Sequence, residues 1–203
     1  RADLTVGRVL GQGGMGVVLL ARQRSLQREV ALKRVRDPST SHHGALLREA
    51  AFTGYLEHPN IVPVHALGRD ATGAPVLVMK RIEGTTLATM IHDPTHASWA
   101  RAEDDRLGFV LRALRGVCDA LAFAHARGVL HRDVKPENVM LGAFGEVYLL
   151  DWGIAVRRGD PLSDESIVGT PVYMAPEMLR PGTEPLDERT DVYLVGGLLH
   201  EWL

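Results

Sequence analysis

The chain has 203 residues, of which 45% are hydrophobic and 24% are charged. Its formal net charge of −2 comes from 23 basic and 25 acidic residues. This near-balance disfavours binding to nucleic acid or to a membrane surface. The single cysteine, Cys118, excludes an internal disulfide and a cysteine-based zinc site, and it fits a reducing cytoplasm. The length allows one large domain or two small lobes.

The two ends of the chain indicate a piece of a longer protein. It begins with Arg1 rather than Met and shows no signal peptide, and its last run, 192–203, is typical of a helix cut in mid-course. No apolar run approaches the roughly 20 residues that a membrane-spanning helix needs. We therefore expect a cytoplasmic fragment without a membrane segment, from a parent protein that could itself be membrane-anchored.

The first 82 residues predict a small sheet with one helix. Segments rich in valine and leucine alternate with turn-like polar residues, as is typical of short strands. One segment between them changes to helical spacing. The expected strands are 4–10, 16–23, 28–35, 58–67 and 74–82, and the expected helix is 41–57.

The remaining residues favour helices. Helical spacing is expected over 83–92 and from about 189, whereas 93–105 is a polar connection with little pattern. The run 106–128 places seven apolar residues at i, i+3 and i+4 spacing, which predicts one stripe facing the core. The stripe contains Leu107, Val110, Leu111, Leu114, Val117, Cys118 and Leu121.

The segment HRDVKPENVM, residues 131–140, is unusually rich in chemistry. It is too polar for a strand, and it contains a proline that a helix interior would reject. The pattern therefore indicates an ordered loop that fixes a carboxylate, an ammonium and an amide close together. A pair of short strands is expected to follow it, at 139–142 and 146–150.

A glycine cluster, GQGGMGVV at 11–18, lies between two expected strands and fits the pattern G-x-G-x-x-G-x-V. Glycines allow backbone amides to approach phosphate oxygens without a side chain in the way. The signal is weak alone, because glycine-rich hairpins are common. A dinucleotide-binding turn is disfavoured, since a strand rather than a helix follows.

Lys33 lies on the third expected strand among apolar neighbours. An exposed strand lysine is the simplest interpretation, but a charge in apolar surroundings needs a partner, and Glu49 on the following helix can supply one. A lysine held by a carboxylate is positioned to reach phosphate oxygens with little reorganisation. Together with the glycine cluster, the pair favours a phosphate site.

The polar loop suits phosphoryl transfer, which needs alignment, charge neutralisation and a group that takes the acceptor's proton. Asp133 can accept that proton, and Lys135 can place its charge near the transferred group. Asn138 and Asp151 offer a neutral and an anionic oxygen, and oxygen ligands suit Mg²⁺.

Taken together, the motifs of this chain resemble those of the eukaryotic-type protein kinases. The resemblance rests on the glycine cluster, VALK at 30–33, HRDVKPEN at 131–138, DWG at 151–153 and GTPVYMAPE at 169–177, and it covers nearly the whole chain. It implies an α+β, bilobal protein-kinase-like fold. The N-lobe, 1–79, would hold five strands and one helix, and a hinge, 80–84, would lead to a mainly helical C-lobe, 85–203, that lacks its last helices. The glycine cluster and Lys135 resemble those of bacterial serine/threonine kinases.

The resemblance also implies roles for individual residues. The residues expected at the ATP phosphates are Gly11, Gly13, Gly16 and Lys33, the last held by Glu49. Those expected at the adenine base are Leu10, Val18, Ala31 and Met140, with Met79 as gatekeeper and the backbone of Lys80 and Ile82 as hinge. Asp133 is the catalytic base, and Lys135 assists it. Asn138 and Asp151 hold Mg²⁺ (or Mn²⁺). Thr170 helps to position the substrate, and Asp191 holds the backbone of the HRD loop, residues 131–138.

The chain departs from the family pattern in two features. The metal motif reads DWG instead of DFG, which we interpret as a packing variation at Trp152 that leaves Asp151 intact. Leu194, Leu198, Leu199, Trp202 and Leu203 are expected to lack part of their burial, because the family's later helices are missing.

Regulation by phosphorylation is a further expectation. Arg132 precedes the catalytic aspartate, and in such kinases this arginine usually meets a phosphate on the activation loop. The candidate phosphorylation sites are Ser163 and Ser166. The alternative is an ordinary solvated loop in which Asp164 and Glu165 already supply negative charge.

The favoured function is an ATP-dependent serine/threonine protein kinase. The alternatives are a nucleotide-binding pseudokinase that signals through its conformation, and a small-molecule phosphotransferase, which would not need GTPVYMAPE. The expected partners are ATP, protein substrates with serine or threonine acceptors, and a second copy for autophosphorylation. No nucleic acid is expected, and the nine histidines show no zinc-ligand spacing.

Overall fold

The computed structural model describes residues 3–13, 16–36, 40–103, 105–160, 167–180, 182 and 184–203. The chain divides into two compact units. Unit 1 contains residues 1–57 and 62–82, and unit 2 contains residues 58–61 and 83–203. The functional boundaries expected at 79/80 and 84/85 stay predictions.

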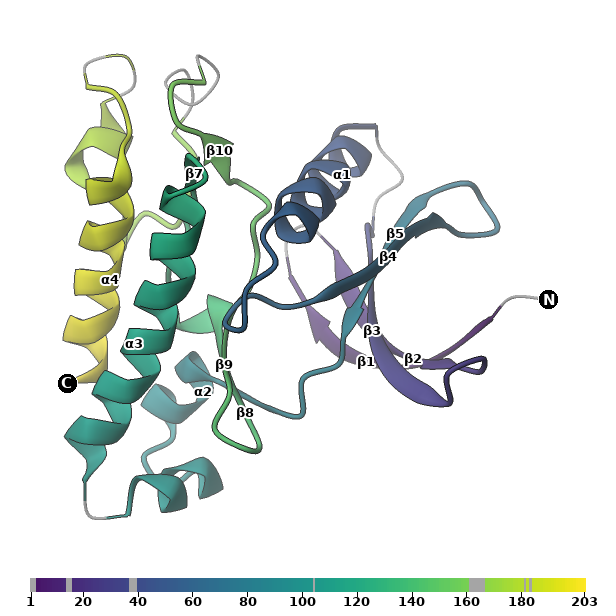
Figure 1. The fold of residues 1–203 in the computed structure, drawn as a ribbon, viewed down its shortest axis with the longest axis horizontal. Coiled ribbons are helices and arrows are strands. Elements are labelled where there is room, and N and C mark those ends of the chain that lie inside the picture. The colour runs from purple at the N-terminus through teal and green to yellow at the C-terminus, as the bar shows by residue number, and fades with distance from the viewer. Residues whose placement is uncertain are drawn as a thin grey trace. The chain divides into compact units, whose positions relative to one another are not determined.

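Unit 1 is built on an antiparallel five-stranded sheet with the order β1-β2-β3-β5-β4 (Figure 1). Its strands are β1 (Leu4–Gln12), β2 (Val17–Gln23), β3 (Arg28–Arg34), β4 (Val64–Arg69) and β5 (Pro75–Lys80), and its helix is α1 (Thr40–Tyr55). The expectation of five strands with one helix is confirmed.

The alternation of side chains along these strands gives unit 1 two apolar layers. One face of the sheet buries a cluster made of Leu19, Ala21, Val30, Leu32, Val76 and Val78. On the other face, Leu77 packs with Leu46 and Ala50 of α1. Helix α1 is thereby fixed on the face that also carries Lys33, because Lys33 pairs directly with Leu77 across the sheet.

The strand expected over 58–67 is wrong in its first half, since β4 begins only at Val64. Residues 58–61 belong to unit 2, where Ile61 forms a parallel bridge with Leu149 and Asn60 Nδ2 donates to the carbonyl of Val147 at 2.9 Å. The physical reason lies in Pro59 and Pro63, which lack the N–H groups that a continuous strand would donate.

Unit 2 is mainly helical, and its short sheets lie beside α3 (Figure 1). The helices are α2 (Leu87–His92), α3 (Arg106–His125) and α4 (Glu188–Trp202), with 3-10 turns η1 (Ala97–Ala102), η2 (Pro136–Asn138) and η4 (Pro176–Leu179). One sheet joins β6 (Gly84–Thr86), β8 (Val139–Gly142) and β9 (Val147–Leu149), and another joins β7 (Val129–Leu130) and β10 (Val156–Arg157). The strand pair expected after the polar loop corresponds to β8 and β9.

Two segments of unit 2 are more structured than their sequences indicated. The helix expected over 83–92 begins with β6, and α2 starts only after Thr86, whose hydroxyl accepts the backbone N–H of Thr89. The polar connection 93–105 contains η1, which is held in place by a hydrogen bond from Trp99 Nε1 to the carbonyl of Met90 at 3.0 Å.

The stripe predicted on α3 is only partly correct. Leu107, Leu111 and Cys118 are exposed, whereas Val110, Leu114, Val117 and Leu121 are buried. The buried arc is rotated toward small residues that allow a close approach: Ala113, Gly116, Ala120 and Ala124. A Cβ on Gly116 would lie 3.0 Å from Val147 Cβ, so packing against β9, rather than the largest apolar stripe, sets the orientation of the helix.

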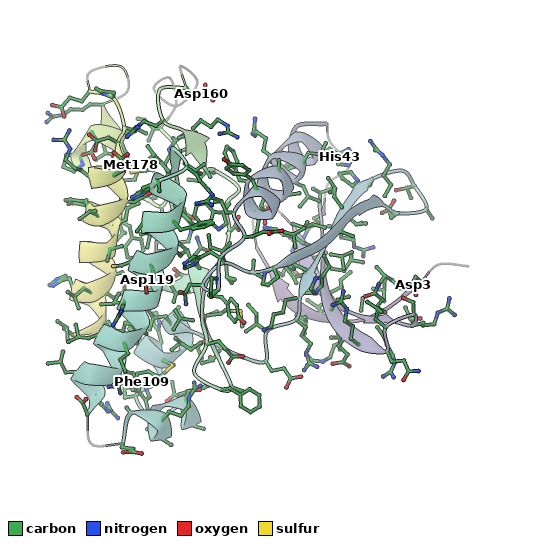
Figure 2. All side chains as sticks on the ribbon, in the orientation of Figure 1. Asp3, His43, Phe109, Asp119, Asp160 and Met178 are labelled. Atoms are coloured by element: carbon green, nitrogen blue, oxygen red, sulfur yellow. The ribbon has the colours of Figure 1, made fainter. Side chains whose placement is uncertain are left out.

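Helices α3 and α4 lie side by side in unit 2 (Figure 1). Phe109, labelled in Figure 2, meets Trp202 edge to face, with ring centroids 6.5 Å apart. Leu194, Leu198 and Trp202 are buried, so their expected loss of burial is wrong, because contacts within unit 2 cover them. Leu199 is half-buried, and Leu203 is exposed as expected.

Helix α4 begins with a charged cap whose contribution can be measured. The Asp187 carboxylate accepts the backbone N–H of Arg189 at 2.8 Å, and hydrogen bonds from the Arg189 side chain hold the pKa of this carboxyl below its ordinary value of 3.8. Replacing Asp187 with Ala is expected to lower the free energy of unfolding by about 1 kcal/mol at neutral pH. Chemical denaturation would measure this loss.

The pH dependence of the same variant has a definite sign. Since folding lowers the pKa of Asp187, its contribution is present above the unfolded-state pKa and is lost as pH falls through the folded-state pKa. The difference between wild type and the alanine variant should therefore shrink in acid. The variant Asp187→Asn keeps an acceptor for the Arg189 N–H, so an equal loss in both variants would contradict the capping role.

Candidate active site

In unit 1, a buried ion pair joins the sheet to its helix. The Nζ atom of Lys33, on β3, lies 2.6 Å from Oε1 of Glu49, on α1, and both side chains are buried. A charge-assisted hydrogen bond of this length holds the ammonium in one position. The pairing expected from the sequence is therefore present, and an exposed strand lysine is excluded.

Several of the residues expected at the nucleotide share the sheet face of Lys33. Val18 pairs with Lys33 across β2 and β3, and Ala31 pairs with Met79 across β3 and β5. Ala31 and Lys33 are two residues apart on one strand, so all four side chains project to the same side. This side of unit 1 presents one fixed cation beside an apolar surface.

The described residues of the glycine cluster lie at the end of β1 and the start of β2. Gly11 pairs with Val18, and the backbone N–H of Gly13 donates to the carbonyl of Gly16 at 3.0 Å. A Cβ on Gly16 would come within 2.3 Å of the Arg34 carbonyl oxygen, so this position tolerates no side chain. Leu10, which precedes the cluster, is 37% exposed.

Lys80, the last residue of β5, and Ile82, two residues later, are both half-buried. The backbone N–H of Lys80 already donates to the carbonyl of Pro63 at 2.9 Å. A contact from Lys80 to an adenine base would therefore have to come from its carbonyl oxygen. Ile82 is the last residue of unit 1, and Met140, also expected at the base, lies half-buried on β8 of unit 2.

In unit 2, three polar side chains converge on Asp133. Its Oδ1 atom accepts a hydrogen bond from the Thr170 hydroxyl at 2.8 Å, and its Oδ2 atom lies 2.7 Å from Lys135 Nζ and 2.9 Å from Asn138 Nδ2. Lys135 Nζ also donates to the Thr170 hydroxyl at 2.7 Å. The structure thus brings together a carboxylate, an ammonium, a hydroxyl and an amide.

The loop that carries Asp133 is fixed through its backbone. Asp191 is fully buried on α4, and its carboxylate accepts the N–H groups of His131 at 2.9 Å and Arg132 at 2.8 Å. His125 Nε2 lies 2.7 Å from the same carboxylate. Arg132 has a positive φ of 70°, a strained conformation for an arginine, and these bonds help to hold it. Asp191 therefore makes the backbone contacts that the resemblance implied.

Sequence reasoning did not find the His125 contact. His125 stands in the last turn of α3, and its partner Asp191 follows 66 residues later. The one available signal was its position six residues before His131, which is not a recognisable spacing for any chemistry.

Asp151 also has an unusual backbone conformation, with a φ of 48°. Its Oδ1 atom accepts the backbone N–H of Gly153 at 3.1 Å. The backbone N–H of Leu150 donates to the Asn138 carbonyl at 2.7 Å, which ties the residue before Asp151 to Asn138. The next residue, Trp152, is fully buried and meets the His131 ring edge to face at 4.5 Å.

The residues present fit a hard divalent cation. The amide nitrogen of Asn138 donates to both the carbonyl and the carboxylate of Asp133, so Oδ1 is the atom of this amide that can act as a ligand. Asp151 adds an anionic oxygen, and Mg²⁺ and Mn²⁺ both prefer oxygen ligands. Within the described ranges, no group of three or more histidine, cysteine, aspartate or glutamate side chains is arranged to hold a metal.

The expected phosphorylation sites cannot be compared with the structure, because Ser163 and Ser166 lie outside the described residues. Arg132, their expected partner, is 4% exposed. Control of the loop by phosphorylation stays a prediction.

Comparison with known proteins decides the family. The chain matches the protein kinase domain family over residues 4–203. This chain belongs to the protein kinase family. Among its curated relatives, the kinase domain is 38% identical over 222 residues to "Serine/threonine-protein kinase PknD" of Chlamydia felis, and 37% identical over 221 residues to the protein of that name in Chlamydia pneumoniae. The protein of the same name in Protochlamydia amoebophila is 36% identical over 220 residues.

These matches cover 97%, 97% and 96% of the kinase domain but only 23%, 23% and 22% of the three relatives. The chain therefore spans less than a quarter of the length of these proteins. In the described part of the kinase domain, no helix is both long enough and apolar enough to cross a membrane.

Proposed function

We propose that this kinase domain transfers the γ-phosphoryl group of ATP to serine or threonine hydroxyls of proteins. The observation that carries the proposal is the convergence of Lys135, Thr170 and Asn138 on the Asp133 carboxylate. These groups match the needs of phosphoryl transfer, which are a proton acceptor, a cation for the transferred group and a support that holds both in place. The names of the relatives agree with this chemistry.

In the proposed reaction, the oxygen of the substrate hydroxyl bonds to the γ-phosphorus, and Asp133 accepts the proton of that hydroxyl. The bond between the γ-phosphorus and the oxygen that bridges it to the β-phosphate breaks, and ADP leaves. Lys135 stabilises negative charge on the transferred group. Thr170 bonds to both side chains, so it sets their mutual orientation and, we propose, helps to position the substrate. Each group acts from a position that its hydrogen bonds already define.

Unit 1 is proposed to bind the nucleotide. Lys33 would contact the α- and β-phosphates, since Glu49 holds its ammonium in place, and the glycine cluster would cover the phosphates with backbone N–H groups. The apolar side chains beside Lys33 would contact the base, with Met79 as gatekeeper. The residues proposed at the base are Leu10, Val18, Ala31, Met79 and Met140, with backbone groups of Lys80 and Ile82.

Asn138 and Asp151 are proposed to hold Mg²⁺ or Mn²⁺. When bound, the cation would neutralise phosphate charge and favour departure of the leaving group. The proposed substrates are proteins with serine or threonine acceptors. A second copy of the chain is also a proposed substrate, which would be phosphorylated at Ser163 or Ser166. Because the reaction consumes ATP and the chain has one cysteine, we propose that it works in the cytoplasm.

A transfer assay tests the proposed function. The full-length protein is incubated with γ-labelled ATP, Mg²⁺ and a generic protein substrate, and the labelled amino acids are identified. Phosphoserine or phosphothreonine is expected. Nucleotide binding without transfer would favour a pseudokinase, whereas labelling of small molecules alone would favour a small-molecule phosphotransferase.

Replacing Lys33 with Met is expected to lower the rate of transfer by about 100-fold, because the fixed cation that contacts the phosphates is lost. Initial rates at several ATP concentrations would measure the loss. Arg22→Met, which removes an exposed cation from the neighbouring strand of the same sheet, serves as the control and should retain wild-type rates. Wild-type activity in the Lys33 variant would contradict its role at the phosphates.

A further inference from the structure

Two consecutive residues at the start of α4 bind two different parts of the active site. The Asp191 carboxylate holds the backbone of His131 and Arg132, directly before Asp133. Thr190 is also fully buried, and its hydroxyl donates to Oε1 of Glu177 at 2.7 Å. Neighbouring helix positions point about 100° apart, so the first turn of α4 can reach the HRD loop with one residue and the GTPVYMAPE segment, 169–177, with the other.

The GTPVYMAPE segment is in turn bonded to the catalytic loop. Thr170, near its start, donates to Asp133 and accepts from Lys135. A Cβ on Gly169 would lie 3.3 Å from the Arg132 carbonyl oxygen, so the two backbones approach closely there. These contacts form a closed circuit. Thr190 of α4 bonds to Glu177, which lies on the same segment as Thr170. Thr170 bonds to Asp133, and the loop that carries Asp133 is bonded to Asp191 of α4.

The end of the segment receives a hydrogen bond from Thr190. Glu177 is half-buried in the short turn η4, beside the buried side chains of Ala175 and Met178. The nearby guanidinium of Arg189 is directed to Asp187, with a hydrogen bond of 2.7 Å from Nη2. Among the described residues, the Thr190 hydroxyl donates the hydrogen bond to the Glu177 carboxylate.

We propose that the Thr190 hydroxyl is a positioning group for phosphoryl transfer, which orients the GTPVYMAPE segment through Glu177 and thereby keeps Thr170 on Asp133 and Lys135. This inference rests on the proposed kinase activity. Its effect has an upper bound, because the segment has a second attachment to α4 through the hydrogen bond from the Tyr173 hydroxyl to Glu201. Loss of the Thr190 hydroxyl loosens the segment without releasing it.

Thr190→Val and Thr190→Ser in the full-length protein form the test pair. Valine has nearly the shape of threonine but no hydroxyl, whereas serine keeps the hydroxyl and loses a methyl group. The valine variant is expected to lower kcat/KM for the protein substrate about tenfold, the lower end of the effect of losing a hydrogen bond to a charged group. Its KM for ATP should stay within about twofold of wild type, and the serine variant should recover most of the activity.

Amide hydrogen exchange of residues 169–177 provides a readout that does not require activity. Faster exchange is expected in this segment for Thr190→Val but not for Thr190→Ser. If either exchange or kcat/KM is unchanged in the valine variant, the inference is overturned. It is also overturned if serine fails to rescue and the KM for ATP rises in parallel, since that pattern indicates a general packing defect.

The same design separates this inference from the proposed function. A wild-type protein that transfers no phosphate refutes the kinase proposal and leaves Thr190 with no reaction to position. The exchange experiment then still decides whether the hydroxyl orders the segment. Conversely, an active wild type with unchanged exchange in the valine variant keeps the kinase proposal and removes the role of Thr190.

Discussion

Replacing Asp133 with Asn is expected to lower the rate of phosphoryl transfer by about 10²–10⁴-fold. Asparagine has nearly the same shape, and its carbonyl oxygen can still accept the hydrogen bond that Thr170 donates to Oδ1. It cannot take a proton from the acceptor hydroxyl, and it removes the negative charge 2.7 Å from Lys135 Nζ. The loss should appear in kcat, measured at saturating ATP and protein substrate.

The control for this variant is Asp119→Asn, which removes an exposed carboxylate from α3 (Figure 2). It should leave the rate unchanged. Nucleotide affinity should also change little in the Asp133 variant, because the proposed contacts of Lys33 and the glycine cluster with the phosphates come from unit 1. Equal rates in the wild type and the Asp133 variant would mean that another group, or no group, accepts the proton.

The parts of the site that the sequence predicts well are close together along the chain. Asp133, Lys135 and Asn138 fall within six residues, and a short ordered loop brings such residues to one place whatever the rest of the fold does. Lys33 and Glu49 are 16 residues apart, and their pairing followed from a simple electrostatic argument, since a charge among apolar strand neighbours needs a partner.

The parts that the sequence did not reveal depend on contacts between distant segments. The buried face of α3 contains Gly116 and three alanines, and it is not the most apolar stripe of the helix. The reason is that β9 packs so closely against α3 that only small residues fit there. Hydrophobic periodicity carries no information on such a close approach. Residues 58–61 were likewise assigned to a strand of unit 1 as part of the run 58–67, although they pack in unit 2.

The contacts of α4 show this limit most clearly. Asp191 was recognised only through the family resemblance, and neither the bond from Thr190 to Glu177 nor the contact with His125 has any local signal. A polar residue in a helical run is usually an exposed one, and its burial becomes visible only when its partners, 13 and 66 residues away, are placed in the structure.

Replacing Asp191 with Asn is expected to lower the free energy of unfolding by about 3–5 kcal/mol, the usual cost of removing one partner from a buried charged contact. The carboxylate accepts Arg132 N–H on Oδ1, and His131 N–H on Oδ2, which also faces His125 Nε2. An asparagine amide can keep only one oxygen. In either orientation its NH₂ group therefore faces a backbone N–H that has lost its acceptor.

Urea denaturation of the wild type, Asp191→Asn and the exposed control Asp119→Asn would measure this effect through the midpoint, at an unchanged m-value. The Asp191 variant should also lose activity under conditions where it remains folded, because an unanchored Arg132 no longer sustains its positive φ and Asp133 moves with it. A variant that is as stable as the Asp119 control would show that the backbone of the HRD loop keeps its conformation without this carboxylate. The closed circuit of contacts through α4 would then have no mechanical role, and the position of Asp133 would have to be set by Thr170, Lys135 and Asn138 alone.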